Sequence, residues 1–286
     1  MPAQMLSWLI AYLAWSRRNV FVAACATGFG LIVLLALLAP WLGLADPAQI
    51  DFSAKLLPPG AAHWFGTDGL GRDIFSGVVF GARVSLLVAL GVVAIATAIG
   101  IPMGLIAGYA GGWIDGLFMR LSDVFLAFPP LLLPITLSAL LGPGLLNAMF
   151  AVAISWFPWY ARIVRSTVLT VKSELYVQSA RAIGTDPASI ALRHVLPNSL
   201  SPVVVQASLD FGFAILTTAS LSFIGMGAVP PTVEWGLMVA SSRSVFLEYW
   251  WTAMFPGLAI FLTVFFASVM VDGIRDSLDP KLARQG

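Results

Sequence analysis

The sequence predicts an all-α integral membrane protein with six membrane-spanning helices, and three observations carry this prediction. Of the 286 residues, 59% are hydrophobic and only 10% are charged, with a mean hydropathy of +0.92. A soluble domain carries about 25% charged residues, so the composition excludes that class. The apolar residues also form long runs, which approach or exceed the roughly 20 residues that a helix needs to cross a bilayer core. Finally, turn-forming glycines and prolines separate or divide these runs.

The individual crossings follow from the runs in chain order. The first run covers residues 19–45, after Arg17 and Arg18, and the others cover residues 84–114, 124–161, 200–225 and 249–271. The run 124–161 is too long for one crossing and contains Leu-Gly-Pro-Gly at 141–144, which predicts two helices joined by a turn. The first run exceeds the 7–15 apolar residues typical of a signal peptide, so we expect an uncleaved anchor rather than a cleaved signal.

The distribution of basic residues predicts the orientation, because cytoplasmic loops are enriched in Lys and Arg. If the N-terminus is cytoplasmic, the outer side holds only Lys55, Arg72, Arg83 and Arg243 of the 15 basic residues. Both termini are then cytoplasmic, and the outer loops are 46–81, a turn near Gly142, and 226–248. The largest inner loop is 165–199. We divide the chain into 1–81 (N-terminus, first crossing and outer loop), a core of five crossings at 82–274, and a cytoplasmic tail at 275–286.

The net charge, the cysteine and histidine positions and the absence of one motif exclude or disfavour several classes of site. The net charge of +1 implies no nucleic-acid partner. Cys25 is the single cysteine and lies in an apolar run, which favours packing over reactivity. His63 and His194 lie far apart without cysteine neighbours, so no metal-site spacing exists. The chain contains no G-x-x-x-x-G-K-[ST] phosphate loop, so we expect it to be non-catalytic and to bind no cofactor itself.

One polar segment interrupts the apolar chain at residues 174–198. Its first half has helical spacing, with a polar side and an opposite side made of Leu175, Tyr176, Ser179, Ala180 and Ile183. Gly184 is expected to end this helix as a C-cap. Asp186 and Pro187 suit the cap and first position of a second helix, which Pro197 is expected to stop. Asn198, Ser199 or Ser201 would then cap the fifth crossing. The apolar sides fit either packing on the membrane helices or docking of a partner, and the pattern leaves both open.

The segment also resembles the Glu-Ala-Ala loop of permease subunits of bacterial ABC importers, through Gln178-Ser179-Ala180, Gly184 and Leu196-Pro197. Here Gln and Ser stand where that family has Glu and Ala. Longer stretches at 65–86, 107–129, 161–169 and 272–282 resemble the dipeptide, oligopeptide and nickel branch of the family, in particular the "C" member of its permease pair. The resemblance implies a type I ABC importer permease fold with a cytoplasmic coupling helix, in a multi-pass protein of the bacterial inner membrane.

The resemblance further implies the partners and the residues that meet them. One or two cytoplasmic ATPase subunits, which use ATP and Mg²⁺, would dock on the loop 174–196. The residues that would face or shape this contact are Gln178, Ser179, Ala180, Gly184, Arg193 and His194. A second, related permease subunit would complete a heterodimer in the lipid bilayer, and an extracytoplasmic binding protein would deliver the substrate. Gly184 also suits a plain C-cap, and the His194 ring also suits an interaction with helix-end carbonyls.

Two polar features remain with open alternatives. Asp210 is the one charge well inside a predicted crossing, and it would either line the pathway, attracting an ammonium group or metal cation, or form a hydrogen bond to a neighbouring helix. In the outer segment 65–76, Asp73 suits a helix cap and Arg72 suits an ion pair that holds the loop. The same segment would alternatively contact the binding protein. Arg120 and Asp123 are expected to form polar ties at the inner helix ends.

The function expected from the resemblance is therefore half of the pathway of an ATP-driven importer of dipeptides or short oligopeptides. Nickel or a metal chelate is the alternative substrate within the family, although no His, Cys or Met cluster favours direct metal binding. A self-sufficient secondary transporter is a remote alternative, because the chain shows one intramembrane charge and no clear repeat.

Overall fold

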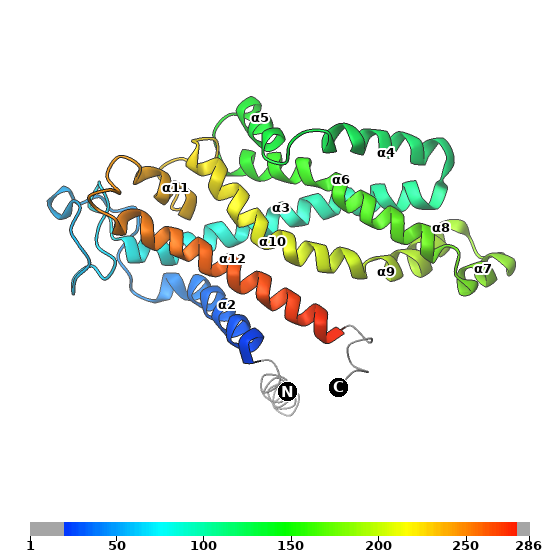
Figure 1. Cartoon of the computed structure of the whole chain (residues 1–286), viewed down its shortest axis with the longest axis horizontal. Coiled ribbons are helices and arrows are strands. Elements are labelled where there is room, and N and C mark those ends of the chain that lie inside the picture. Colours follow the sequence, from blue (N-terminus) through cyan, green and yellow to red (C-terminus); the bar gives the residue numbers. More distant parts are fainter. Residues whose placement is uncertain (1–19, 279–286) are drawn as a thin grey trace.

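Most of the residues that the structure describes lie in helices. The computed structural model describes residues 20–278, without the side chains of residues 272 and 274–278. The β pairing in this part is an isolated bridge between Thr67 and Asp73. The longer helices are α2 (Val20–Leu38), α3 (Ile74–Ala110), α4 (Gly112–Leu126), α6 (Leu145–Val171), α10 (Ser201–Phe223) and α12 (Trp251–Leu278). The all-α prediction is confirmed, and these helices extend mostly along the long axis of the molecule (Figure 1).

The shorter elements lie between these helices and at the two ends of the molecule. In chain order they are η1 (Ala39–Trp41), η2 (Phe52–Ala54), α5 (Leu132–Leu141), α7 (Leu175–Ala182), α8 (Pro187–Ile190), the π-helical segment η3 (Ala191–Val195), α9 (Leu196–Ser199) and α11 (Trp235–Ser241). The loop before α3 and the helix α11 lie at the left end of Figure 1, whereas α7 and α8 lie at the right end. The predicted outer and inner segments therefore occupy opposite ends of the helix assembly.

Four helical stretches of the described residues have the length and apolarity to cross a membrane. They are Val20–Trp41, α3, α10 and Trp251–Val271 of α12. The apolar α5 is shorter, and α6 has 27 residues but carries Arg162 and Arg165 in its second half. Four of the predicted crossings are thus present by length and composition, and the total of six stays a prediction.

One helix start follows the sequence prediction, and one helix break does not. The helix α3 begins at Ile74, where the predicted cap forms: the Asp73 carboxylate accepts from the Ser76 backbone N–H at 2.7 Å. The boundary expected after residue 81 therefore falls inside α3. The run 124–161 breaks at Gly142–Gly144 as predicted, but it also breaks between α4 and α5. Pro129 and Pro130 lie at this second break, and proline both removes a backbone donor and disfavours helical geometry in the preceding residue.

The helices α3 and α6 pack closely because glycines line their contact. Gly100, Gly104 and Gly108 follow at intervals of four residues, so they share one face of α3. A Cβ atom on Gly104 would lie 2.4 Å from the carbonyl oxygen of Ala161 and 2.7 Å from the Cβ of Val164. The backbones approach each other as in the small-residue contacts of membrane helices, where packing rather than hydrophobic transfer drives association.

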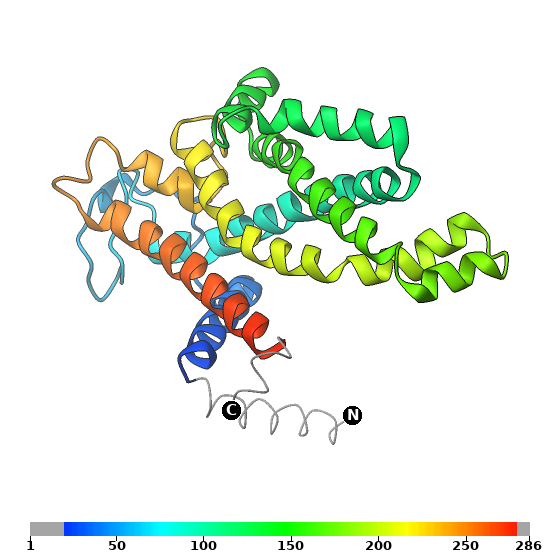
Figure 2. The same cartoon turned by 45° about the vertical axis from the view of Figure 1, so that its right-hand side comes forward.

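The remaining helices surround this pair. One continuous core of buried residues includes Val92 and Ala96 of α3, Val152 and Val164 of α6, and Ile215 of α10. The helices α2 and α12 lie side by side on one flank, as both views show (Figures 1 and 2). The helices α4 and α5 lie on the other side of α6. The core therefore joins the predicted crossings into one unit from which the loop between α6 and α10 projects.

Candidate coupling loop and its anchors

The loop between α6 and α10, residues 172–200, forms a projection at one end of the molecule. Figure 2 shows α7 and α8 extending beyond the ends of the neighbouring helices. The helix α7 ends before Gly184, which has φ +82°. This left-handed conformation favours glycine because it has no Cβ, and the Thr185 N–H donates to the Ala180 carbonyl at 3.1 Å to close the turn. The predicted glycine turn between two short helices is confirmed.

The second half of the loop follows the prediction at its start and departs from it at its end. Asp186 caps α8, accepting from the Ser189 N–H at 3.0 Å, and Pro187 occupies the first turn. Pro197, however, does not stop the helix. It lies in the first turn of α9, where its missing N–H removes little, and the π-helical segment η3 absorbs the irregularity before it. The expected side-chain cap of the fifth crossing is also absent, because Leu200 precedes α10 and forms no side-chain cap.

The apolar residues of the loop divide between the interior and the surface. Val177, Ala180, Ile190, Ala191 and Val195 are buried, so part of the loop packs on the protein itself. Four others are exposed: Leu175 (79%), Tyr176 (45%) and Ile183 (83%) on α7 and directly after it, and Leu192 (57%) on η3. The predicted side made of Leu175, Tyr176, Ser179, Ala180 and Ile183 is therefore mixed, because Ala180 is buried and the other four residues are exposed. Val177 is a buried residue of α7 that the sequence prediction did not name. Its apolar side chain, three residues before the buried Ala180, is the signal in the sequence that could have found it.

The residues predicted to meet a partner occupy different environments. Gln178, Ser179, Gly184 and Arg193 are exposed, His194 is half-buried, and Ala180 is buried. The Gln178 side-chain amide donates to the Ser173 carbonyl at 2.8 Å, and the Ser179 hydroxyl donates to the Leu175 carbonyl at 2.9 Å. Both polar groups therefore stabilise α7 and its entry. Ala180 can shape the loop but does not present a side chain at its surface.

Charged side chains at and near the end of α6 bind the neighbouring helices on which the loop rests. Lys172 Nζ donates to the Gly108 carbonyl at 2.7 Å. Arg165 binds Asp115 of α4 through two hydrogen bonds, one of them 2.6 Å from Nη2 to Oδ2. These hydrogen bonds lower the pKa of the Asp115 carboxyl below its usual value. The structure thereby shows an anchor, Asp115–Arg165, that the sequence analysis did not single out.

Two further contacts hold the same region. Arg162 pairs with Asp123, so the predicted polar tie of Asp123 is confirmed, whereas Arg120 is exposed. The guanidinium of Arg181 lies 5.6 Å from the centre of the Tyr109 ring, which places a cation over an aromatic face and joins α7 to α3. The loop therefore rests on the ends of α3 and α6, and α4 braces α6 from the side.

Asp210 lies on α10 and faces α6. The Tyr160 hydroxyl donates to its Oδ2 at 2.6 Å, and the Gln206 amide donates to its Oδ1 at 2.8 Å. Asp210 and Gln206 are half-buried, and Tyr160 is fully buried. The hydrogen bond to a neighbouring helix is therefore present, and the pathway role of Asp210 stays a prediction.

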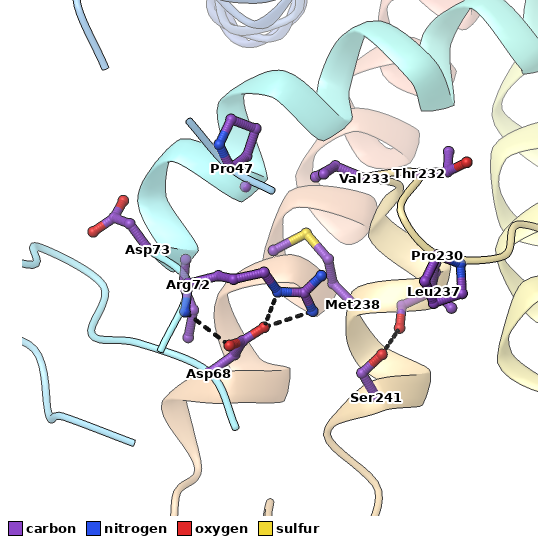
Figure 3. Close-up of a pocket in the computed structure, with 12 residues that line it drawn as sticks. Pro47, Asp68, Arg72, Asp73, Pro230, Thr232, Val233, Leu237, Met238 and Ser241 are labelled. Carbon is purple, nitrogen blue, oxygen red and sulfur yellow. Dashed lines mark hydrogen bonds and ion pairs between the residues drawn. The ribbon is translucent and has the colours of Figure 1, made fainter. Parts of the chain in front are cut away.

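The polar residues of the outer loop form a structural cluster. Asp68 binds the Arg72 side chain at 2.7 Å and also accepts from the backbone N–H of Leu70 and Arg72. His63 Nδ1 lies 2.9 Å from Asp73 Oδ2. Figure 3 shows the Arg72–Asp68 pair beside a small cavity of about 30 Å³ against α11. The predicted structural ion pair is confirmed, and a contact with a binding protein stays a prediction. The described residues include no group of three or more His, Cys, Asp or Glu side chains arranged to hold a metal ion.

Comparison with known proteins shows the family. Residues 100–284 match the family described as "Binding-protein-dependent transport system inner membrane component", and this is more than half of the chain. The chain belongs to this family. Its members are permease components in the inner membrane, so the predicted permease role and the membrane location agree with the family's description.

Similar members of this permease family cover most of the chain. It is 49% identical over 272 residues to the probable D,D-dipeptide transport system permease protein DdpC of Escherichia coli (strain K12), covering 95% of this chain and 91% of that protein. It is 47% identical to the dipeptide transport system permease protein DppC of Alkalihalophilus pseudofirmus, over 87% of this chain and 82% of that one. It is 43% identical to the glutathione transport system permease protein GsiD of Pectobacterium atrosepticum, over 96% and 91%.

A solved structure supports the fold of this permease. A chain of the inward-facing MetNI methionine ABC transporter matches it with a TM-score of 0.56 and 18% sequence identity, covering 71% of this chain and 96% of that one. At this identity the likeness concerns the fold alone. Together with the family, it confirms the predicted ABC importer permease fold.

Proposed function

We propose that this permease forms one half of the membrane pathway of an ATP-driven importer that takes up dipeptides or short oligopeptides. The named relatives above are permeases for a D,D-dipeptide, a dipeptide and glutathione, all of which are peptides. Their names support a peptide substrate over nickel or a metal chelate. The proposal includes a second, related permease subunit and an extracytoplasmic binding protein, with both termini of this chain in the cytoplasm.

The exposed apolar tip of the loop is the observation that carries the mechanism. Leu175, Ile183 and Leu192 are each more than half exposed, and the loop that carries them projects beyond the ends of the neighbouring helices (Figure 2). Apolar side chains exposed on such a projection gain free energy when a partner covers them. The proposed partner is a cytoplasmic ATPase subunit, which would bind ATP with Mg²⁺ and supply the energy of ATP hydrolysis. This chain has no phosphate loop of its own.

The anchors explain how such a contact would reach the membrane helices. Movement of the loop would pass directly along the chain to α6, and from there to α3 through Lys172 and to α4 through Arg165. A loop held by buried residues and by side-chain contacts transmits displacement, whereas a loosely attached loop would absorb it. Gly184 allows the two short helices of the loop to form one compact projection.

A matched pair of charge substitutions tests the docking surface. Ile183→Glu places a charge on the tip, and Leu247→Glu places the same charge on an equally exposed residue, 83% against 87%, in the outer region. We expect Ile183→Glu to lose most ATPase subunit on co-purification of the assembled importer, and Leu247→Glu to retain it. Equal retention by both variants would contradict the proposed docking surface.

Reconstituted vesicles test transport itself. The importer with its ATPase subunits and binding protein should accumulate labelled dipeptide only with ATP, and the purified permease chain alone should hydrolyse none. Uptake without ATPase subunits would indicate a secondary transporter instead, and ATP-dependent uptake of nickel in preference to peptide would replace the substrate.

A further inference from the structure

The side chains of Tyr160, Gln206 and Asp210 form a polar group between α6 and α10. Tyr160 comes from α6, and the other two come from α10. The buried Tyr160 hydroxyl and the Gln206 amide each donate to a different oxygen of Asp210. Within the described part of the chain, Tyr160–Asp210 is the side-chain hydrogen bond that joins α6 to α10. Breaking this bond would leave the buried Tyr160 hydroxyl without its acceptor and the Asp210 carboxylate with one donor fewer, which is costly where water is scarce.

The position of this bond relates it to the coupling loop. Tyr160 precedes the end of α6 at Val171 by about three helical turns, and Asp210 follows the start of α10 at Ser201 by about two and a half turns. Both distances are about 15 Å at the usual rise of an α-helix. The loop and the adjoining parts of α6 and α10 therefore form a hairpin with legs of similar length, and the hydrogen bond crosses it at the far end from the loop.

The two legs of this hairpin are joined to the loop in different ways. The α6 leg is fixed to α3 by the glycine contact at Gly104 and to α4 by the Arg165–Asp115 pair. The α10 leg also packs in the core, through Val203, but it joins the loop beyond the π-helical segment η3, where the regular helical hydrogen-bond ladder is interrupted. A displacement of the loop therefore reaches α10 through an irregular segment, and a contact between the two legs would keep α10 in register with α6.

We propose that Tyr160 and Asp210 are positioning residues for energy coupling, which make α6 and α10 move together when an ATPase subunit displaces the loop. The inference rests on the proposed function. Neither residue touches ATP in this role, and Asp210 acts through its bond to Tyr160. Without the bond, ATP-driven displacement of the loop deforms α10 instead of moving both helices, so hydrolysis continues while less peptide enters.

The test measures ATP hydrolysed per peptide imported by the complete importer in vesicles, with its ATPase subunits and binding protein. The variants are Tyr160→Phe, Asp210→Asn and the double variant. The control is Thr218→Val, which removes a buried α10 hydroxyl that donates to the carbonyls of Ala214 and Ile215 in its own helix. We expect Tyr160→Phe, which removes the donor hydroxyl, to raise the ratio about fivefold or more, at the low end of measured coupling between sites, and the double variant to match it. Asp210→Asn keeps an amide oxygen that can accept from Tyr160, so it should raise the ratio less. The control should stay near wild type.

Each outcome separates this inference from its alternatives. Additive effects, or a normal ratio of ATP hydrolysed to peptide imported in a folded Tyr160→Phe importer, would overturn the proposed role of the Tyr160–Asp210 hydrogen bond. A loss confined to positively charged peptides in Asp210→Asn, with Tyr160→Phe unaffected, would assign Asp210 to the pathway and also overturn it. If Asp210→Asn does not assemble, Tyr160→Phe decides, because phenylalanine keeps the ring in the buried site. A wild-type importer that shows no ATP-driven peptide uptake would refute the proposed function. A normal ratio of ATP hydrolysed to peptide imported in the variants would refute only the proposed role of the Tyr160–Asp210 hydrogen bond.

Discussion

Substitution of Gly184 tests whether the shape of the loop, rather than its side chains, sets the affinity for the ATPase subunit. Gly184 has φ +82°, is exposed, and a Cβ placed on it would meet nothing within 4 Å. A larger residue therefore causes no collision with the rest of the protein. The cost of Gly184→Val arises from the backbone alone, because β-branched residues strongly disfavour the left-handed region. Gly184→Asn adds a side chain of similar size that tolerates this region.

The size of the expected effect follows from that conformational cost. A left-handed residue other than glycine costs about 1–2 kcal/mol, which corresponds to a factor of about 5–30 in the equilibrium between the docking shape and its alternatives. Affinity falls by at most this factor, because a partner binds only the competent fraction. Val177 and Ile190 remain buried on either side of the turn, so we expect the permease to stay folded.

The assay is a titration of labelled ATPase subunit onto the assembled permease pair in lipid nanodiscs, with thermal unfolding measured on the same samples. Gly184→Val should weaken binding about 5- to 30-fold, with a small change in unfolding temperature. Gly184→Asn should bind within about twofold to threefold of wild type. Equal affinities for the valine and asparagine variants would refute the reasoning, because they would show that the left-handed turn does not limit docking.

Three further predictions concern the helices that support the loop. Gly104→Ala should destabilise the permease by about 1–3 kcal/mol through overpacking, as measured by thermal unfolding. Gly30→Ala should be neutral or stabilising, because the space around its Cβ position is open. The reverse order would contradict the close contact between α3 and α6. Asp115→Asn should destabilise by about 1 kcal/mol or less and by more than Asp123→Asn, which is more exposed. Because the pKa of Asp115 is lowered in the folded state, its contribution to the free energy of unfolding should be complete above about pH 4 and disappear as the pH falls further. A stability difference between wild type and Asp115→Asn that persists at lower pH would contradict the ion pair. Glu234→Ala should cost about 1–2 kcal/mol, since this carboxylate is 2% exposed and accepts two backbone N–H groups of α11; Glu234→Gln should lose less, and proteolysis near α11 would show the difference.

The features that the sequence predicted well are those encoded by short-range physics. The cap at Asp73, the turn at Gly184 and the start of α8 at Asp186 each depend on one residue and its nearest neighbours in the chain. The pair Arg72–Asp68 spans four residues and belongs to the same group. Local hydrogen bonding and backbone sterics decide such features before any tertiary contact forms.

The errors lie where a local preference competed with its surroundings. Pro197 was expected to stop a helix, but it falls in a first turn, where proline is tolerated, after a π-helical segment. The amphipathic pattern of α7 also could not distinguish buried Val177 from exposed Leu175 and Ile183. A pattern of apolar residues gives the sides of a helix but not the neighbour that each side meets.

By itself, the sequence determined that this protein lies in a membrane, where its apolar runs fall, and where its polar loop begins and turns. These properties follow from the transfer of apolar residues out of water and from the backbone preferences of single residues. Only the tertiary structure decided that Arg165 meets Asp115 and that Tyr160 meets Asp210, each pair being 50 residues apart in the chain. Such partners are chosen by the way α3, α6 and α10 pack, and the glycines of α3 allow that packing without revealing in the sequence which helix will approach them.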